Sequence, residues 1–276
     1  MDLRNARICV QKFHHDPQLH SYIHRNLVRG KDPVVSAIFM NDLLWSPGDT
    51  ITISFLPFSP SDAPAWYTLA QVSSSLTKEQ MDIERRARAA PSFEDAVKMI
   101  VKELVQPAVP KLNLQFVDGQ GDVRVRFQKY GGSSSLVGTA CKSAPPDQFT
   151  VTFGWMDVGT IVHEFSHVLG MLHEHQNPSG GIQWNTDAVY QWAQQTQGWD
   201  KETTDVNILD AYPSNEISGS VFDPESVMLY FFPPELTMND LQVGQNLRYS
   251  QTDLMYLAIG EVVMLAHHLD GWTQVG

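Results

Sequence analysis

Three histidines and a glutamate lie close together in the middle of the chain, between His163 and His173. On an α-helix, residues four apart lie on one face, so His163 and His167 can direct two ring nitrogens at one ion. Glu164 follows His163 directly, which turns its carboxylate about 100° around the helix axis. That position is beside the ion, where a water molecule would bind, and it suits a general base.

A glycine can end this helix and let a third histidine join the site. Gly170 can adopt the left-handed conformation that closes a helix without a Cβ penalty, so the chain can turn sharply and bring up His173. Three protein ligands leave a fourth position open for water, which is typical of catalytic zinc. Zinc lowers the pKa of bound water to about 7 and polarises carbonyl groups, so Glu164 can complete the deprotonation. The sequence therefore predicts one catalytic Zn²⁺ and hydrolysis of peptide bonds.

Chance is the alternative explanation of this pattern. The chain has ten His and eighteen Gly among 276 residues. At that composition, all five fixed positions coincide by chance roughly once in ten thousand sequences or less, whereas a bare HExxH is a far commoner accident. The composition therefore favours a metal site.

The stretch from His163 to His173 matches the metzincin signature HExxHxxGxxH, and Glu174 directly after it resembles the astacin branch of that clan. Downstream, the segment Ser226-Val227-Met228-Leu229-Tyr230 resembles the astacin Met-turn. The resemblance implies that Met228 lies under the metal site and that Tyr230 is a switchable ligand that stabilises the tetrahedral intermediate. A phenol O–H suits that role, because it can donate to a developing oxyanion.

Two departures narrow the resemblance. Leu229 stands where animal astacins usually have a histidine, and the two cysteines of this chain cannot supply the paired disulfides of those enzymes. The chain is therefore similar to a microbial-type, astacin-like metzincin. This implies an α+β, zincin-like fold: a twisted mixed sheet, a backing helix, a zinc-binding active-site helix and an irregular, partly helical C-terminal subdomain.

Hydrophobic periodicity places the other elements. Alternating polar and apolar residues predict strands at 50–56, 112–116 and 123–127, with turn residues between the last two. Helices are expected over 78–90, from the cap Ser92 to Pro107, after Asn185 or Thr186, and over 201–209. Ser250 and Asp253 form a capping-box pattern that predicts a C-terminal helix. Core packing is the favoured role of Trp184, Trp192 and Trp199, and a substrate pocket is the alternative.

A further alternating segment lies just before the zinc helix and consists of Phe149, Thr150, Val151, Thr152 and Phe153. In the resembled fold this is the antiparallel edge strand, to which an extended substrate adds its backbone. A fully paired interior strand is the alternative. We expect Gly131–Ser135 to form a mobile loop near the cleft.

Residues 1–44 form an N-terminal extension, either a latch or a packing segment, before a catalytic domain over 45–276. Cys9 is a candidate latch, because a thiolate is a good zinc ligand and N-terminal residues keep several metzincin families inactive. A structural or idle cysteine is the alternative, and pairing of Cys9 with Cys141 stays open. The histidines of this extension suit a polar surface segment better than a second metal site; they are His14, His15, His20 and His24.

The net charge of −12 argues against nucleic acid or an anionic membrane as a partner. Arg85, Arg86 and Arg88 are interspersed with Asp82 and Glu84, which predicts a solvated helix face. No apolar run is long enough to cross a membrane, and charged residues in the first twenty positions exclude a signal peptide in this chain. We therefore expect a cytoplasmic protein, or one exported by another route, unless a leader was removed.

The expected function is that of a zinc endopeptidase acting on peptide or protein substrates, with its oligomeric state open. One alternative is a toxin or effector protease dedicated to a single partner protein. Another is a zinc-binding module without catalysis, but the presence of Glu164 and Tyr230 argues against it, since binding alone needs neither.

Overall fold

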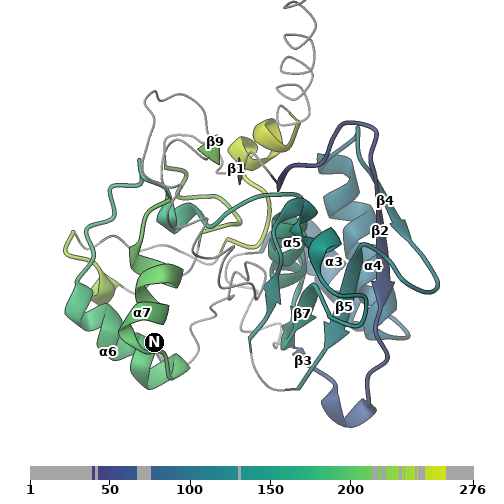
Figure 1. Cartoon of the computed structure of the whole chain (residues 1–276), viewed down its shortest axis with the longest axis horizontal. Coiled ribbons are helices and arrows are strands. Elements are labelled where there is room, and N and C mark those ends of the chain that lie inside the picture. The colour runs from purple at the N-terminus through teal and green to yellow at the C-terminus, as the bar shows by residue number, and fades with distance from the viewer. Residues whose placement is uncertain are drawn as a thin grey trace, which may run out of the picture.

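Two lobes make up the part of the chain that the structure describes, one built on a sheet and one on helices (Figure 1). The computed structural model describes residues 39–40, 43–66, 76–129, 132–212, 217–218, 222–229, 232, 234–239, 241 and 246–258. The sheet lobe contains helices α3, α4 and α5, and the helical lobe contains α6 and α7. This arrangement confirms the predicted α+β class, with a partly helical C-terminal subdomain.

A five-stranded mixed sheet forms the first lobe, in the order β4-β2-β5-β7-β6. Its strands are β2 (Thr50–Phe55), β4 (Asn113–Phe116), β5 (Val123–Phe127), β6 (Ser134–Ser135) and β7 (Val151–Phe153). All neighbours are parallel except β6, which runs antiparallel to β7. The turn between β4 and β5 therefore joins no hairpin, because the two strands flank β2 on opposite sides.

The prediction that Phe149–Phe153 forms the antiparallel edge strand was wrong. Within this segment, β7 pairs in parallel with β5 on one side and antiparallel with β6 on the other. All three residues of β7 are buried, as is typical of interior strands. The strand at this edge of the sheet is β6, and β4 forms the opposite edge. Because Ser133, Ser134 and Ser135 are buried, their assignment to a mobile loop was wrong.

Both backing helices begin at a cap, of which the sequence predicted only Ser92. Helix α3 (Lys78–Arg88) begins at a capping box of Thr77 and Gln80, and α4 (Phe93–Ile100) begins at Ser92, whose side chain accepts from the Asp95 amide. The second helix continues as a π-helix, Val101–Val105, and a 3-10 turn, Gln106–Ala108. The run ends at Ala108, one residue after the proline at which the sequence predicted its end.

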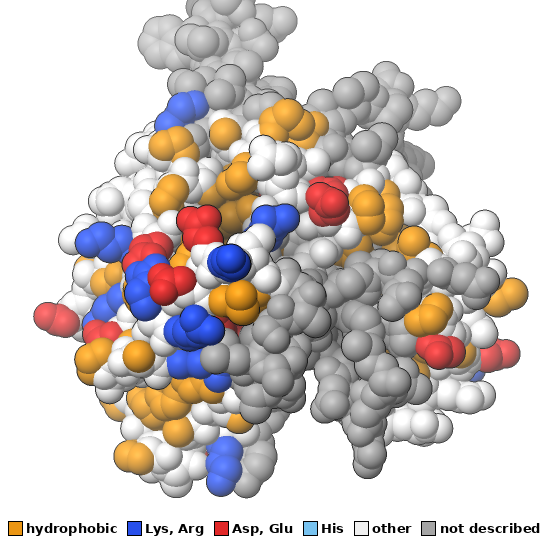
Figure 2. Space-filling view, turned by 180° about the vertical axis from the view of Figure 1, so that it is seen from behind, with side chains coloured by type: hydrophobic (Ala, Val, Ile, Leu, Met, Phe, Trp, Pro, Cys, Tyr) orange, Lys and Arg blue, Asp and Glu red, His pale blue; other side chains and the backbone are white. Residues whose placement is uncertain are grey.

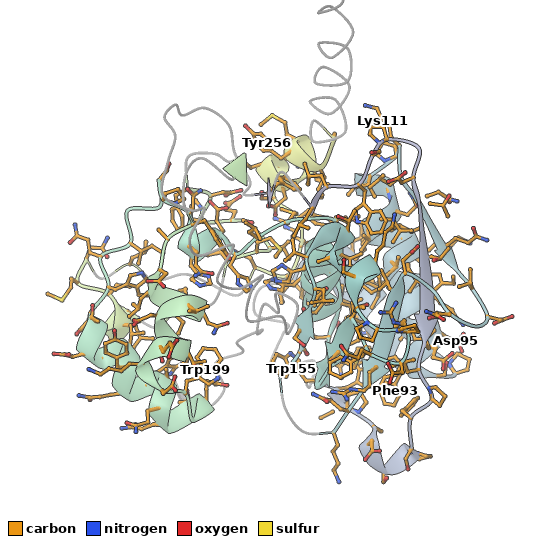
Figure 3. The ribbon with its side chains drawn as sticks, in the orientation of Figure 1. Phe93, Asp95, Lys111, Trp155, Trp199 and Tyr256 are labelled. Carbon is orange, nitrogen blue, oxygen red and sulfur yellow. The ribbon has the colours of Figure 1, made fainter. Side chains whose placement is uncertain are left out.

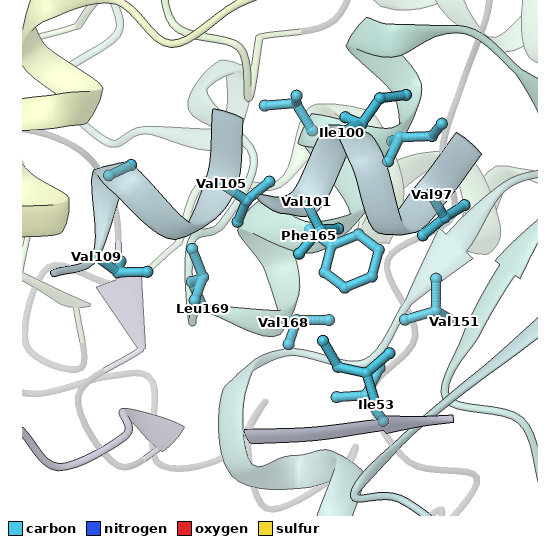
Figure 4. Close-up of a cluster of buried hydrophobic side chains, with 14 of the residues drawn as sticks. Ile53, Val97, Ile100, Val101, Val105, Val109, Val151, Phe165, Val168 and Leu169 are labelled. Carbon is cyan, nitrogen blue, oxygen red and sulfur yellow. The ribbon is translucent and has the colours of Figure 1, made fainter. Parts of the chain in front are cut away.

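The main core lies between these helices, the sheet and α5 (Val158–Val168) (Figure 4). Phe165 of α5 has no exposed surface and lies among side chains of α4 and of the π-helix. Ile53 and Val151 contribute from the sheet to the same cluster. The helix that carries the histidines is therefore held inside the core, which fixes its position.

The second lobe has its own smaller core. It contains α6 (Thr186–Gln197), capped by Asn185, then α7 (Lys201–Thr204) and a π-helix, Asp205–Leu209. Trp192 is buried in the cluster, and Trp184 and Trp199 pack against it, which confirms the core assignment of the tryptophans. Figure 3 shows Trp199 in this lobe and Trp155 in the other.

The remaining elements are short. They are the strands β1 (Phe39–Met40), β3 (Ala65–Trp66), β8 (Trp155–Met156) and β9 (Ile217–Ser218), the 3-10 turns Pro60–Asp62, Gly138–Ser143, Glu174–Gln176 and Pro234–Leu236, and a helix over 251–258. Strand β1 pairs with β9, and Phe39 is buried in the main core. Phe39, near the end of the predicted extension, therefore packs on the main core.

The surface carries charges of both signs. On the back of the molecule, basic and acidic side chains are interspersed rather than gathered into a patch of one sign (Figure 2). On α3, the exposed Arg86 donates to Asp82 and Glu103, which agrees with the predicted solvated helix face. Glu84 is buried, so its assignment to that face was wrong. Among the helices that the structure describes, none is long and apolar enough to cross a membrane.

Candidate metal centre and active site

Helix α5 presents the first two histidines. It begins at Asp157, whose carboxylate accepts from the Thr160 amide at 2.9 Å. It closes at Gly170, which has a φ of +102°, and the Met171 amide then reaches back to the carbonyl of Ser166 at 3.0 Å. This left-handed closure is the one predicted for Gly170, and the chain turns from it toward His173.

The three predicted ligands meet at one point. The Nε2 atom of His173 lies 3.3 Å from Nε2 of His163 and 3.0 Å from Nε2 of His167. Two nitrogens bound to one tetrahedral zinc at about 2.0–2.1 Å would lie about 3.3 Å apart. The spacing of the three imidazoles therefore fits a zinc ion.

Hydrogen bonds from the other ring nitrogen, Nδ1, orient two of the imidazole rings. Nδ1 of His163 donates to the Val227 carbonyl, and Nδ1 of His167 donates to the Met171 carbonyl, both at 2.8 Å. A ring that donates through Nδ1 leaves the Nε2 lone pair for a metal. Burial lowers the pKa of His163 to about 4 and holds the pKa of His167 and His173 well below the ordinary value. The imidazoles are therefore neutral, as metal ligation requires.

The Met-turn segment lies against this centre. Met228 is fully buried, and its carbonyl accepts from the Glu174 amide at 3.0 Å, directly after the third ligand. The neighbouring Val227 supplies the carbonyl that orients His163. The structure therefore brings together two motifs that are far apart in the sequence. Tyr230 and Cys9 lie outside the described residues.

Comparison with known proteins agrees with this geometry. The family model described as astacin, a family of peptidases, matches residues 89–257. The chain belongs to the astacin family. This astacin is a zinc metalloendopeptidase, and its three clustered histidines are positioned to hold the ion.

Solved structures show the same fold. A structure of myroilysin is 27% identical, with a TM-score of 0.64, and the match covers 81% of this chain and 98% of that one. A crystal structure of myroilysin is 24% identical, with a TM-score of 0.54, over 93% of this chain and 91% of that one. No curated protein sequence matches the chain.

Glu164 is a buried residue of α5. It follows His163 on α5, and none of its surface is exposed. A carboxylate in such a dry position interacts strongly with a neighbouring charge or proton donor, because water does not screen it. This placement in the astacin site suits proton transfer.

A network of buried carboxylates surrounds the Met-turn, and the sequence did not reveal it. Glu174 accepts from the Asn177 side chain and from the Asp223 amide, both at 2.9 Å, and burial raises its pKa to about 8. Asp253 accepts from the side chain of Ser226 at 2.7 Å and from the amide of Val227 at 2.9 Å. The capping-box pattern did place Asp253 at a helix start, but it carried no signal for these distant contacts.

The second lobe also reaches the site of this astacin. The ring of His175 lies 5.2 Å from the ring of His173, and its Nε2 donates to the Asn207 carbonyl at 3.0 Å. The Gln176 side chain donates to the carbonyls of Val206 and Asp210, both at 2.8 Å. These acceptors belong to the π-helix of the second lobe or follow it directly. The third ligand is therefore braced by a lobe for which the sequence predicted helices but no contact with the metal centre.

Proposed function

We propose that this zinc endopeptidase uses Glu164 as its general base and proton carrier. The observation that carries this proposal is the fully buried Glu164, which directly follows a ligand on the helix that supplies two of the three converging, neutral imidazoles. When bound, zinc supplies the Lewis acid that polarises the scissile carbonyl and lowers the pKa of water.

The chain's own residues account for the proton transfers. Glu164 accepts a proton from the attacking water and delivers it to the amine nitrogen of the leaving group, so its charge is restored after each turnover. Tyr230 donates its phenol O–H to the oxyanion that develops on the carbonyl, a role that rests on the Met-turn resemblance. The edge strand beside which an extended substrate would lie is β6 rather than β7.

The test compares cleavage of a denatured protein mixture by the wild type and Glu164→Gln, with zinc content determined in both. Amide replacement removes the base but no ligand, so we expect bound zinc in both proteins and a loss of at least about 10²-fold in cleavage rate. Glu235→Gln, at an exposed position, is the matched control and should cleave like the wild type.

Three other outcomes separate the alternatives. Cleavage by Glu164→Gln at the wild-type rate would refute the general base. Cleavage of one partner protein but not of the denatured mixture would favour the dedicated protease. Bound zinc with no cleavage of any substrate would favour the silent module.

A further inference from the structure

The residues just before the sheet contact the end of the zinc helix. The indole Nε1 of Trp45 donates to the Val168 carbonyl at 2.7 Å, across 123 positions of sequence. Both residues are buried, and Val168 is the last residue of α5 and the direct neighbour of His167. A side chain from the start of the domain therefore caps the helix that carries two ligands.

This hydrogen bond completes the closure of α5. Carbonyls in the last turn of a helix have no partner within the helix. The Met171 amide donates to the carbonyl of Ser166 at 3.0 Å, and the Gly170 amide donates to the carbonyl of His167 at 2.9 Å. The Val168 carbonyl accepts its hydrogen bond from the indole of Trp45. Without the indole N–H, the buried Val168 carbonyl would lose its donor. Because an unsatisfied buried acceptor costs free energy, the turn would shift toward another donor.

Other contacts hold the same turn. Phe39 forms an antiparallel bridge with Met171, whose carbonyl orients the His167 ring. Leu44 packs against Gly170 so closely that a Cβ there would lie 2.8 Å from its Cδ2 atom. The ammonium group of Lys142 lies 4.5 Å from the centre of the Trp45 ring and helps to hold the indole.

We propose that Trp45 is a positioning residue of the metal centre. Its N–H holds the turn over 168–171, and that turn sets both the orientation of His167 and the approach of His173. The proposal rests on the proposed function for the identity of the metal site, but it does not depend on the general base. A zinc-binding measurement therefore tests it separately from cleavage.

The experiment compares Trp45→Phe with Trp192→Phe, using the full chain. Both tryptophans are buried, so both variants lose similar volume. Trp192 is the matched control because its indole nitrogen has no hydrogen-bond partner in the part of the chain that the structure describes. Zinc affinity is measured by competition with a chromophoric chelator, and melting temperature is measured in parallel.

We expect roughly tenfold weaker zinc binding for Trp45→Phe, within the range seen when outer partners of metal ligands are removed. Trp192→Phe should bind zinc like the wild type even if its melting temperature falls. The visible spectrum of the cobalt-substituted protein should change only for Trp45→Phe, since it reports ligand geometry. Equal zinc affinity in all three proteins would overturn the proposal and reduce Trp45 to a core residue.

A second variant separates the N–H from the packing. Site-specific replacement of Trp45 by benzothienylalanine keeps the bicyclic ring and substitutes sulfur for N–H, so the fold is preserved. Zinc binding as weak as in Trp45→Phe would support the hydrogen bond as the cause. Wild-type affinity in this variant would overturn the proposal in favour of packing alone.

Discussion

At the scale of single residues, Asp253 connects the C-terminal helix to a zinc ligand. Its carboxylate accepts from the Ser226 side chain and from the amides of Val227 and Ser250. The Val227 carbonyl in turn accepts from His163. Burial raises the pKa of Asp253 to about 6, although the three donors oppose the shift.

The stability contributed by Asp253 should therefore depend on pH. Between its ordinary pKa of 3.8 and about 6, the folded protein binds this proton more tightly than the unfolded chain does. The free energy of unfolding of the wild type should therefore exceed that of Asp253→Asn by the largest amount below about pH 4. This difference should fall by at most about 3 kcal/mol between about pH 4 and pH 6, and it should stay constant above pH 6. Urea unfolding of both proteins from pH 3.5 to 8 measures the difference. A difference that grows with pH would mean that the three donors outweigh burial.

At the scale of elements, the buried side chain of Glu84 ties α3 to α5 by a hydrogen bond and also forms an ion pair within α3. The Oε2 atom of Glu84 accepts from the Val158 amide at 2.9 Å, at the first residue of α5, and its Oε1 atom lies 2.6 Å from Arg88. Burial raises the pKa of Glu84. An acidic side chain at a helix N-terminus also complements the helix dipole.

Removal of Glu84 should therefore be costly. Glu84→Ala leaves the Arg88 guanidinium and the Val158 amide without this acceptor, and we expect a loss of about 3 kcal/mol in the free energy of unfolding. The matched control is Glu94→Ala, which removes a pair of the same spacing, Glu94 with Lys98, whose side chains are 39% and 42% exposed. That pair should contribute less than about 0.5 kcal/mol. Equal losses in the free energy of unfolding for Glu84→Ala and Glu94→Ala, measured by urea unfolding, would contradict a stabilising role of the Glu84 contact between α3 and α5.

At the scale of the whole molecule, the metal should stabilise the fold. The ligands come from α5 and from the chain after it, and the third ligand is braced by the helical lobe. Zinc at 100 times its dissociation constant would add about 2.7 kcal/mol, provided that the unfolded chain does not bind it. For a protein of this size, that corresponds to a rise of about 5–10 °C in melting temperature.

Calorimetry with added zinc and with a chelator measures this rise. His163→Asn lacks one ligand and should show little of it. The same rise in this variant would place the stabilising zinc elsewhere, for example among the N-terminal histidines, which lie outside the described residues.

Local spacing determined the ligand set and most of the elements. His163, His167, Gly170 and His173 follow from helix geometry and a left-handed stop, because these depend on residues at most ten positions apart. The caps at Ser92, Asn185 and Ser250 were predicted for the same reason: a cap is a contact over three residues.

Only the tertiary structure decided which distant groups meet. Alternation revealed β7 as a strand, but neighbours from other parts of the chain decided that it lies inside the sheet. Glu84 reads as a surface residue on its helix and is buried only because α5 begins against it. The Trp45 hydrogen bond leaves no local trace, since side-chain contacts across 123 positions depend on how the whole core closes.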